Sequence, residues 1–289
     1  MKRIALMLAA ALLTAPAVLF GQSYSASAPM LALEGVTDGG GGHAASTTPA
    51  SGSSNGPLSH VAFGGGISPL GIQLQATTNL ASHLNLRAGG NFFNYSTNFT
   101  SNGINANAQL NLASAGASVD VYPFRWGFRI SPGVLFYNQN QLTAAANVPA
   151  GTSFTLNDTT YYSANTNSAT GATPIVGSGA LGLNATKPAF TATVGFGNTA
   201  RGNRHWSFPV DLGVAFIGAP TVKVNLSGWA CADQAQTECS NLADSTDPNS
   251  VAVQSNLTAQ VAKWTSDLNP LKTYPILSAG VAYSFRIRK

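Results

Sequence analysis

Residues 104–112 read INANAQLNL, and apolar and amide side chains alternate along them without a break. Successive side chains point to opposite faces only in a β-strand, so this period of two predicts a strand with one apolar and one polar face. The polar face holds only uncharged amides: Asn105, Asn107, Gln109 and Asn111. We therefore look for a fold in which one face of a sheet is apolar and the other carries neutral hydrogen-bonding groups.

The same period recurs along most of the chain from about residue 60. Turn signals separate the alternating segments, which read ISPLGIQLQAT, LNLRAGGNFFNY, FRISPGVLFYN, PAFTATVGFGN, WSFPVDLGVAFIG, TVKVNLSG and ILSAGVAYSFRIR. Residues 140–187 are rich in Asn, Thr and Ala and predict either one long loop or a further hairpin around TSFTLNDTTYYS. The sequence thus predicts an all-β fold of about eight strands, with ten as the alternative.

The composition is unusually poor in charge. Charged residues make up 8% of the 289 residues, against roughly 25% in ordinary soluble proteins. Soluble proteins need mixed surface charge to stay dispersed, so much of this surface does not face bulk water. The net charge of +4 comes from few residues, and no basic cluster is interleaved with aromatic residues. This pattern argues against nucleic-acid binding.

The first residues predict export. MKR followed by IALMLAAALL is typical of a signal peptide, assigned here to residues 1–28, although an uncleaved membrane anchor is the alternative. Residues 29–59 include the Gly-, Ser- and Thr-rich tract DGGGGHAASTTPASGSSNGP, which predicts disorder. Beyond residue 28, no window approaches the ~20 apolar residues of a spanning helix. Residues 60–289 are predicted to form the folded domain.

Two architectures accommodate many alternating strands. A soluble sandwich turns its apolar face inward and normally exposes charged residues. A transmembrane barrel turns its apolar face to lipid and its polar face to the lumen, where amides and hydroxyls avoid the cost of unpaired charge. Aromatic residues near segment ends fit interfacial girdles: Phe92, Phe93, Tyr122, Trp126, Trp206, Tyr274, Tyr283 and Phe285. The sequence therefore predicts a transmembrane antiparallel up-and-down barrel.

One segment near the C-terminus breaks the period of two. Asp247 is a candidate N-cap, and Pro248 suits the first helical turn. The apolar residues that follow are three or four positions apart, as one stripe of an amphipathic helix requires: Val253, Leu257, Val261, Trp264 and Leu268. We expect a short helix that packs on the barrel mouth or lies at the membrane interface, with partner binding as the alternative.

Cys231 and Cys239 bracket the turn-prone stretch CADQAQTEC. In an oxidising compartment, a close pair of this kind most simply forms a disulfide that closes a loop. Free thiols are one alternative. A metal site that recruits Asp233 and Glu238 is another, although no His lies near in sequence.

A set of charged residues falls on the predicted polar faces. Arg87, Asp211 and Lys223 share this parity, and Arg129 joins them if its strand keeps phase. Because an ionised group inside a narrow barrel must be paired, we expect Asp211 to contact at least one cation. Together with the amides of residues 105–111, these side chains form the predicted polar network of the lumen. Its role is either structural pinning or selectivity and gating.

Segments of the chain resemble small exported barrels of the OmpA/OmpW-like superfamily. The resemblance rests on YPILSAGVAYSF, WSFPVDLGVAFIGAPTVKVNLSG and YPFRWGFRISPG and covers roughly residues 60–285. It implies a location in the bacterial outer membrane, with membrane lipid and the outer-membrane assembly machinery as partners. In that superfamily the last residue is usually aromatic, whereas Phe285 is followed here by RIRK. Because the sequence stops at the predicted barrel, we expect no peptidoglycan-binding domain like the one that follows the barrel in OmpA-type members.

Few residues suit catalysis. The histidines are His43, His60, His83 and His205, and each is interpreted as a turn or linker residue. No nucleophile elbow, paired-carboxylate or zinc motif occurs, so no catalytic residue, metal or cofactor is predicted. We expect a non-enzymatic barrel for envelope structure, adhesion or restricted passage of small solutes. A membrane-embedded enzyme acting on lipid or protein and a soluble secreted binding protein remain the alternatives.

Overall fold

The computed structural model describes residues 56–101, 103–124, 127–200 and 205–287. The expected signal peptide and most of the expected disordered segment lie outside these residues. Eight antiparallel strands pair in chain order, and the last pairs with the first, so the barrel closes. They are β1 (His60–Ser68), β2 (Gly71–Ala81), β3 (Leu84–Ser101), β4 (Ile104–Val121), β5 (Phe128–Asn138), β10 (Ala189–Phe196), β12 (Val210–Phe216) and β16 (Thr273–Arg286). The predicted antiparallel barrel of about eight strands is confirmed.

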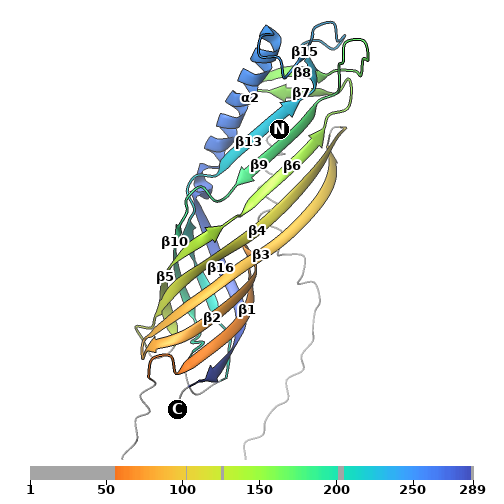
Figure 1. The fold of residues 1–289 in the computed structure, drawn as a ribbon. Coiled ribbons are helices and arrows are strands. Elements are labelled where there is room, and N and C mark those ends of the chain that lie inside the picture. The colour runs from red at the N-terminus through yellow and green to blue at the C-terminus, as the bar shows by residue number, and fades with distance from the viewer. Residues whose placement is uncertain (1–55, 102, 125–126, 201–204, 288–289) are drawn as a thin grey trace, which may run out of the picture.

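A second body, which we call the head, continues beyond one end of the barrel (Figure 1). Its main sheet extends the upper part of β4 through β6 (Gln141–Asn147), β9 (Val176–Gly182) and β13 (Thr221–Ser227). A small sheet contains β7 (Ser153–Leu156), β8 (Thr159–Ser163), β14 (Trp229–Cys231) and β15 (Cys239–Asn241). The α2 helix (Pro248–Asp267) packs along the head, and the short η2 helix (Asn269–Lys272) leads into β16. A two-residue strand, β11 (Trp206–Ser207), pairs with β16.

The long β3–β4 hairpin belongs to both bodies. Each of its strands has 18 residues. The lower part of β4, from Ser114 to Val121, pairs with β5 of the barrel, whereas residues 105–111 pair with β6 of the head. The head is therefore built on the same two strands that form one wall of the barrel.

The apolar face of this hairpin changes sides where the barrel meets the head. In lower β3, the buried inward residues are polar, as with Asn85 and Arg87, while Leu86 is exposed on the outside. In upper β4, the buried inward residues are Leu110 and Leu112. Side chains of one parity keep pointing inward along each strand, so it is the sequence that switches from polar-inside to apolar-inside.

The α2 helix confirms the predicted element near the C-terminus. Asp247 accepts a hydrogen bond from the backbone N–H of Asn249 at 2.8 Å and acts as the N-cap. Val253 and Leu257 are buried in the head, and Val261 packs against the same core. The stripe thus fixes α2 against the head, while Leu268 reaches the apolar cluster at the barrel mouth.

The stretch TSFTLNDTTYYS forms the β7–β8 hairpin of the small sheet. Asn157 and Asp158 both have positive φ values, of 46° and 68°, as a two-residue type I′ turn requires. Of the two possibilities for residues 140–187, the structure therefore has a hairpin, and it adds β6 and β9 on either side. These strands belong to the head and leave the barrel with eight.

Candidate functional site

A cluster of four charged side chains crosses the barrel lumen. Arg87 Nη1 lies 2.8 Å from Asp211 Oδ2, and Arg129 Nη2 lies 2.8 Å from each carboxylate oxygen of the same residue. Arg87 Nη2 also lies 3.0 Å from Asp120 Oδ1. These residues come from β3, β4, β5 and β12, so the cluster ties strands across the barrel.

We call these four residues the charge cluster: Arg87, Asp120, Arg129 and Asp211. The cluster is buried, and its formal charges cancel. None of the four residues is more than 9% exposed, and Asp120 is fully buried. Two guanidinium groups face two carboxylates, so their formal charges cancel. Arg129 also donates to the carbonyl oxygens of Phe196 and Gly197. Such a cluster stabilises only as a complete set, because loss of one member leaves a buried charge unpaired.

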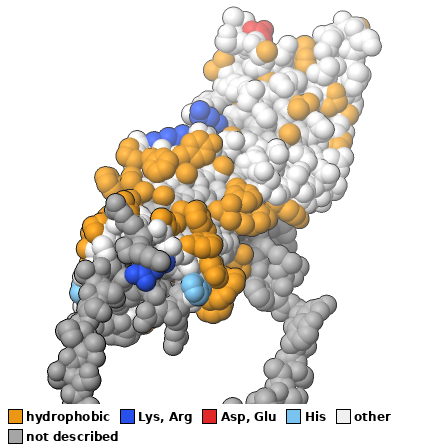
Figure 2. Space-filling view, turned by 60° about the horizontal axis from the view of Figure 1, so that its bottom comes forward, with side chains coloured by type: hydrophobic (Ala, Val, Ile, Leu, Met, Phe, Trp, Pro, Cys, Tyr) orange, Lys and Arg blue, Asp and Glu red, His pale blue; other side chains and the backbone are white. Residues whose placement is uncertain are grey.

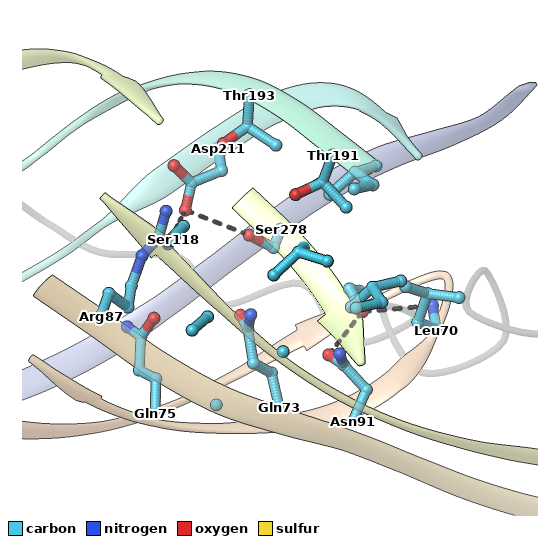
Figure 3. Close-up of a pocket in the computed structure, with 17 residues that line it drawn as sticks. Leu70, Gln73, Gln75, Arg87, Asn91, Ser118, Thr191, Thr193, Asp211 and Ser278 are labelled. Atoms are coloured by element: carbon cyan, nitrogen blue, oxygen red, sulfur yellow. Dashed lines mark hydrogen bonds and ion pairs between the residues drawn. The ribbon is translucent and has the colours of Figure 1, made fainter. Parts of the chain in front are cut away.

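A cavity of about 90 Å³ lies next to the charge cluster, and Arg87 and Asp211 form part of its lining (Figure 3). Its lining mixes polar and apolar groups, and the labelled side chains converge on it from several strands. Arg87 and Asp211 meet on one side, and Ser278 donates to Asp211 Oδ2 at 3.5 Å. The Oε1 atom of Gln75 lacks a protein partner within the described residues. Water can satisfy a polar cavity of this size.

An apolar cluster closes the barrel at the head end. Leu70, in the β1–β2 turn, is only 7% exposed and lines the cavity. The hydroxyl of Tyr274 donates to the carbonyl of Pro69 in that turn at 3.2 Å. Residues from the barrel rim and the head complete the closure: Leu110, Leu112, Leu142, Leu181, Leu183, Ala189, Ala215 and Ile217. We call this group, with Leu70 and Tyr274, the apolar plug.

The structure brings together only part of the predicted lumen network. Arg87, Arg129 and Asp211 meet in the lumen as described above. Asn105, Asn107 and Gln109 are instead exposed on the outer face of the head, where β4 pairs with β6, and Asn111 shares that face. The lumen assignment of these four amides is therefore corrected.

The amides carry hydrogen bonds on the outside of the head rather than inside the barrel. Asn107 donates to Asn98 Oδ1 at 2.7 Å, and Thr100 donates to Asn105 Oδ1 at 2.7 Å. The predicted alternation is present, but alternation alone does not say which face is inside. Lys223 needs the same correction, because it is exposed on the outer face of β13.

Cys231 and Cys239 form a disulfide in the head. The loop between them is ordered by Asp233, which accepts hydrogen bonds from the hydroxyl of Thr237 and the backbone N–H of Glu238. These hydrogen bonds lower the pKa of Asp233. The Thr237 hydroxyl contributes most, and the backbone N–H groups of Glu238 and Thr237 contribute less. Asp233 therefore orders the loop, and no group of three or more potential metal ligands occurs within the described ranges.

Large apolar side chains cover the outside of the barrel (Figure 2). Phe63, Leu74, Phe190, Leu212 and Leu277 are each more than half exposed. Aromatic side chains contact one another near the lower end, as in the pairs Phe63–Phe285, Phe128–Phe196 and Trp206–Tyr283. Phe190 and Phe216 face each other across β10 and β12 near the upper end. The outer surface is thus an apolar belt edged with aromatic residues. No α-helix in the described part of the chain has the length and apolar character needed to cross a membrane.

The described histidines have local partners. His60 Nδ1 lies 3.0 Å from Ser59 Oγ, and His83 Nδ1 lies 2.9 Å from Ser82 Oγ. His205 stacks on Tyr283, and its ring nitrogen lies 3.0 Å from the carbonyl of Ser284. Ser59 also contacts the Asn79 amide. These contacts contain no His–carboxylate pair within the described residues. His43 lies outside them.

Asp120 and Leu70 are residues of the site that the sequence reasoning missed, and Tyr274, which was expected in an interfacial girdle, is only 8% exposed and belongs to the apolar plug. Asp120 was detectable: Ser114, Ser118 and Asp120 share even numbers with the apolar residues of 104–112, so polar and apolar positions exchange parity after Leu112. Leu70 carries no such signal, because its position in a turn does not reveal that it folds into the barrel mouth.

Comparison with known proteins leaves the family open. No family model matches the chain, and no curated protein matches it. Membership of the OmpA/OmpW-like superfamily therefore stays a prediction. Among solved structures, the chain is similar to CarO of Acinetobacter baumannii, with 19% identity over 79% of this chain and 98% of that one at a TM-score of 0.47. It is also similar to Acinetobacter baumannii CarO2, with 16% identity, 80% and 100% coverage, and a TM-score of 0.48.

Proposed function

We propose that this chain is a non-enzymatic outer-membrane protein whose sealed barrel anchors the head at the cell surface. In this role the barrel contributes to envelope structure and the head is available for adhesion. The observation that carries the proposal is the reversal of polarity between the two bodies. An apolar exterior over a polar interior suits lipid, whereas a polar exterior over an apolar core suits water.

The dimensions and pairing of the barrel strands support insertion in a bilayer. Barrel strands cross a membrane with about 9–11 tilted residues, and β2 and β5 have 11 each. The closed ring pairs the backbone groups that hydrocarbon cannot satisfy. Aromatic residues at both ends of the apolar belt match the girdles of membrane barrels.

The connections between strands support an orientation with the head outside the cell. Outer-membrane barrels have short periplasmic turns and long extracellular loops. β2 and β3 are joined by a two-residue turn at the lower end, whereas β5 and β10 are joined through β6–β9 at the upper end. The C-terminal strand also ends at the lower end (Figure 1).

The filled lumen favours anchoring over solute passage. Barrels of about eight strands are filled by their own side chains. Here the charge cluster crosses the lower part of the lumen, and the apolar plug covers the upper part. The cavity between them has a volume of about 90 Å³, enough for only a few waters. Passage of a solute would require both layers to open.

Purified protein in planar bilayers tests this function. We expect the protein to insert into vesicles and to migrate differently on gels before and after boiling. We expect no conductance steps. Regular conductance steps would contradict the sealed barrel and favour passage. Folding in buffer without detergent would instead favour a soluble secreted protein. Hydrolysis of lipid or ester, lost on substitution of His83 or His205, would favour a membrane enzyme.

A further inference from the structure

Three exposed lysines lie where the apolar belt of the barrel ends and the head begins. Lys187 is in the link from β9 to β10, Lys272 ends η2, and Lys223 is near the start of β13. Figure 2 shows basic side chains at the upper edge of the hydrophobic surface, where the mostly uncharged head starts. We call Lys187, Lys223 and Lys272 the rim lysines.

Backbone contacts place two rim lysines on either side of the same strand end. The Ile217 N–H donates to the carbonyl of Lys272 at 3.1 Å, and the Ile217 carbonyl accepts from Thr186 N–H at 2.8 Å. Thr186 immediately precedes Lys187. Lys187 and Lys272 therefore flank the same point at the end of β12.

Strand register fixes the height of these lysines above the belt. Phe190 pairs with Phe216, and Phe216 pairs with Thr273, so these residues form one row across β10, β12 and β16. Phe190 and Phe216 are 66% and 48% exposed and mark the upper edge of the belt. Lys272 directly precedes Thr273 of this row, and Lys187 lies three residues before Phe190. Lys223 pairs with Ala180 at the base of the head.

The rim lysines carry positive charge that no carboxylate of the described residues pairs with. No ion pair involves Lys187, Lys223 or Lys272 within the described part of the chain, whereas Lys263 of α2 is paired with Asp158 at 3.1 Å. Asp233, Glu238 and Asp244 belong to the loops of the small sheet. Asp267, at the end of α2, is the carboxylate nearest to the rim lysines along the chain. The rim therefore presents amines next to an apolar surface.

We propose that the rim lysines bind phosphorylated lipid headgroups of the surrounding leaflet. The inference rests on the proposed insertion of the barrel in a membrane, because insertion puts these amines at headgroup depth. Lysines bind phosphate as flexible point charges, and basic residues next to a membrane attract anionic lipid. The apolar belt below contacts the acyl chains. A phosphorylated lipid therefore interacts with both the lysine amines and the belt, whereas free phosphate interacts with the amines alone.

Lipid retention measured by native mass spectrometry tests the site. Detergent-solubilised protein is mixed with phosphatidic acid or with phosphatidylcholine of the same acyl chains. We expect the protein to retain phosphatidic acid in preference. Each single change, Lys187→Gln, Lys223→Gln or Lys272→Gln, should weaken retention about five-fold, and the triple variant should lose the preference. Gel migration before and after boiling verifies that each variant is folded.

Lys263→Gln is the matched control, because it removes the same charge from an ion-paired lysine of the head. It should retain phosphatidic acid as the native protein does. Equal retention of both lipids by the native protein, or unchanged preference in the triple variant, would overturn the inference. Displacement of the lipid by inorganic phosphate at similar concentration would also overturn it. Failure of the native protein to insert into vesicles is a separate result that rejects the proposed function itself.

Discussion

The barrel and the head solve the same packing problem in opposite ways. The barrel encloses a neutral cluster of two arginines and two aspartates and exposes residues such as Phe190 and Leu212. The head encloses Ile175, Val253 and Leu257 and exposes amides such as Asn107. Both use the same two strands, β3 and β4. The geometry of a strand is therefore compatible with either polarity on its inner face. Whether lipid or water surrounds the strand determines which residues each face carries.

Removal of Asp211 should have the largest effect, because it leaves two buried arginines without their shared partner. We expect Asp211→Ala to lower the free energy of unfolding by about 3–5 kcal/mol. Urea unfolding in lipid vesicles measures the change. The matched control is Asp158→Asn, which breaks the exposed Asp158–Lys263 pair and should change stability by less than about 1 kcal/mol. Equal small effects would show that the charge cluster does not hold the barrel together.

An apolar truncation should act on the head instead. Leu257 is 5% exposed in the head core, and Leu257→Ala should cost about 2–5 kcal/mol. Limited proteolysis should then cut within residues 141–267, while the barrel keeps its gel migration. Val251→Ala, at an exposed position of the same helix, should leave the head resistant. Loss of the barrel together with the head would show that the barrel depends on the core of the head.

The two outer surfaces should respond differently to one new charge. Leu212 is exposed on the barrel, in the middle of β12, and Leu212→Arg should cost about 2–4 kcal/mol in a bilayer. Asn98 is exposed on upper β3 of the head, and Asn98→Arg should stay within about 0.5 kcal/mol. Unfolding in vesicles measures both. A large cost at Asn98 together with a small cost at Leu212 would reverse the assignment of water and lipid.

The disulfide should matter only to the head. Cys231 and Cys239 close a short loop with a sequence separation of 8, and a loop of this size stabilises by about 2–3 kcal/mol. The double change Cys231→Ser, Cys239→Ser should make the head easier to cleave by protease, and the barrel should unfold as before. An equal loss of barrel stability would mean that the two bodies are coupled.

The smallest effect concerns pH in the loop that Asp233 orders. Hydrogen bonds from Thr237 and Glu238 lower its pKa, so this contribution is present above the ordinary pKa of an aspartate. It is lost as the pH falls through the lowered value of the folded state. The protection factors of the Thr237 and Glu238 amides, which are their hydrogen-exchange rates corrected for the intrinsic dependence on pH, should fall at acid pH. Asp233→Asn should remove that dependence, and an unchanged pH profile in the variant would assign it to another group.

Much of the architecture could be predicted from period alone. Alternation predicts the barrel strands, and the three- and four-residue spacing from Val253 predicts α2. The charge cluster was partly accessible, because Arg87, Arg129 and Asp211 have the parity of lumen residues. Asp120 was missed, because the exchange of parity after Leu112 was not applied to the rest of β4.

The main error, the lumen placement of Asn105–Asn111, has a physical cause. A period of two defines two faces of a strand but does not say which of them points inward. The apolar face points outward where lipid surrounds the strand and inward where water does. The low charge of the whole chain suggested lipid everywhere, yet the head keeps its outer face polar with amides and hydroxyls. Closure of the lumen by Leu70 depends on contacts between segments far apart in sequence, which local patterns do not encode.

Quenching of a fluorescent label by lipid tests the reversal of polarity most directly. Leu86 and Asn98 lie on the same face of β3, at exposed positions of the barrel and the head. Single Leu86→Cys and Asn98→Cys variants are labelled, with the native cysteines held in their disulfide, and inserted into vesicles of brominated lipid. The account predicts strong quenching at residue 86 and none at residue 98. Equal quenching at both positions, or quenching at 98 alone, would contradict it.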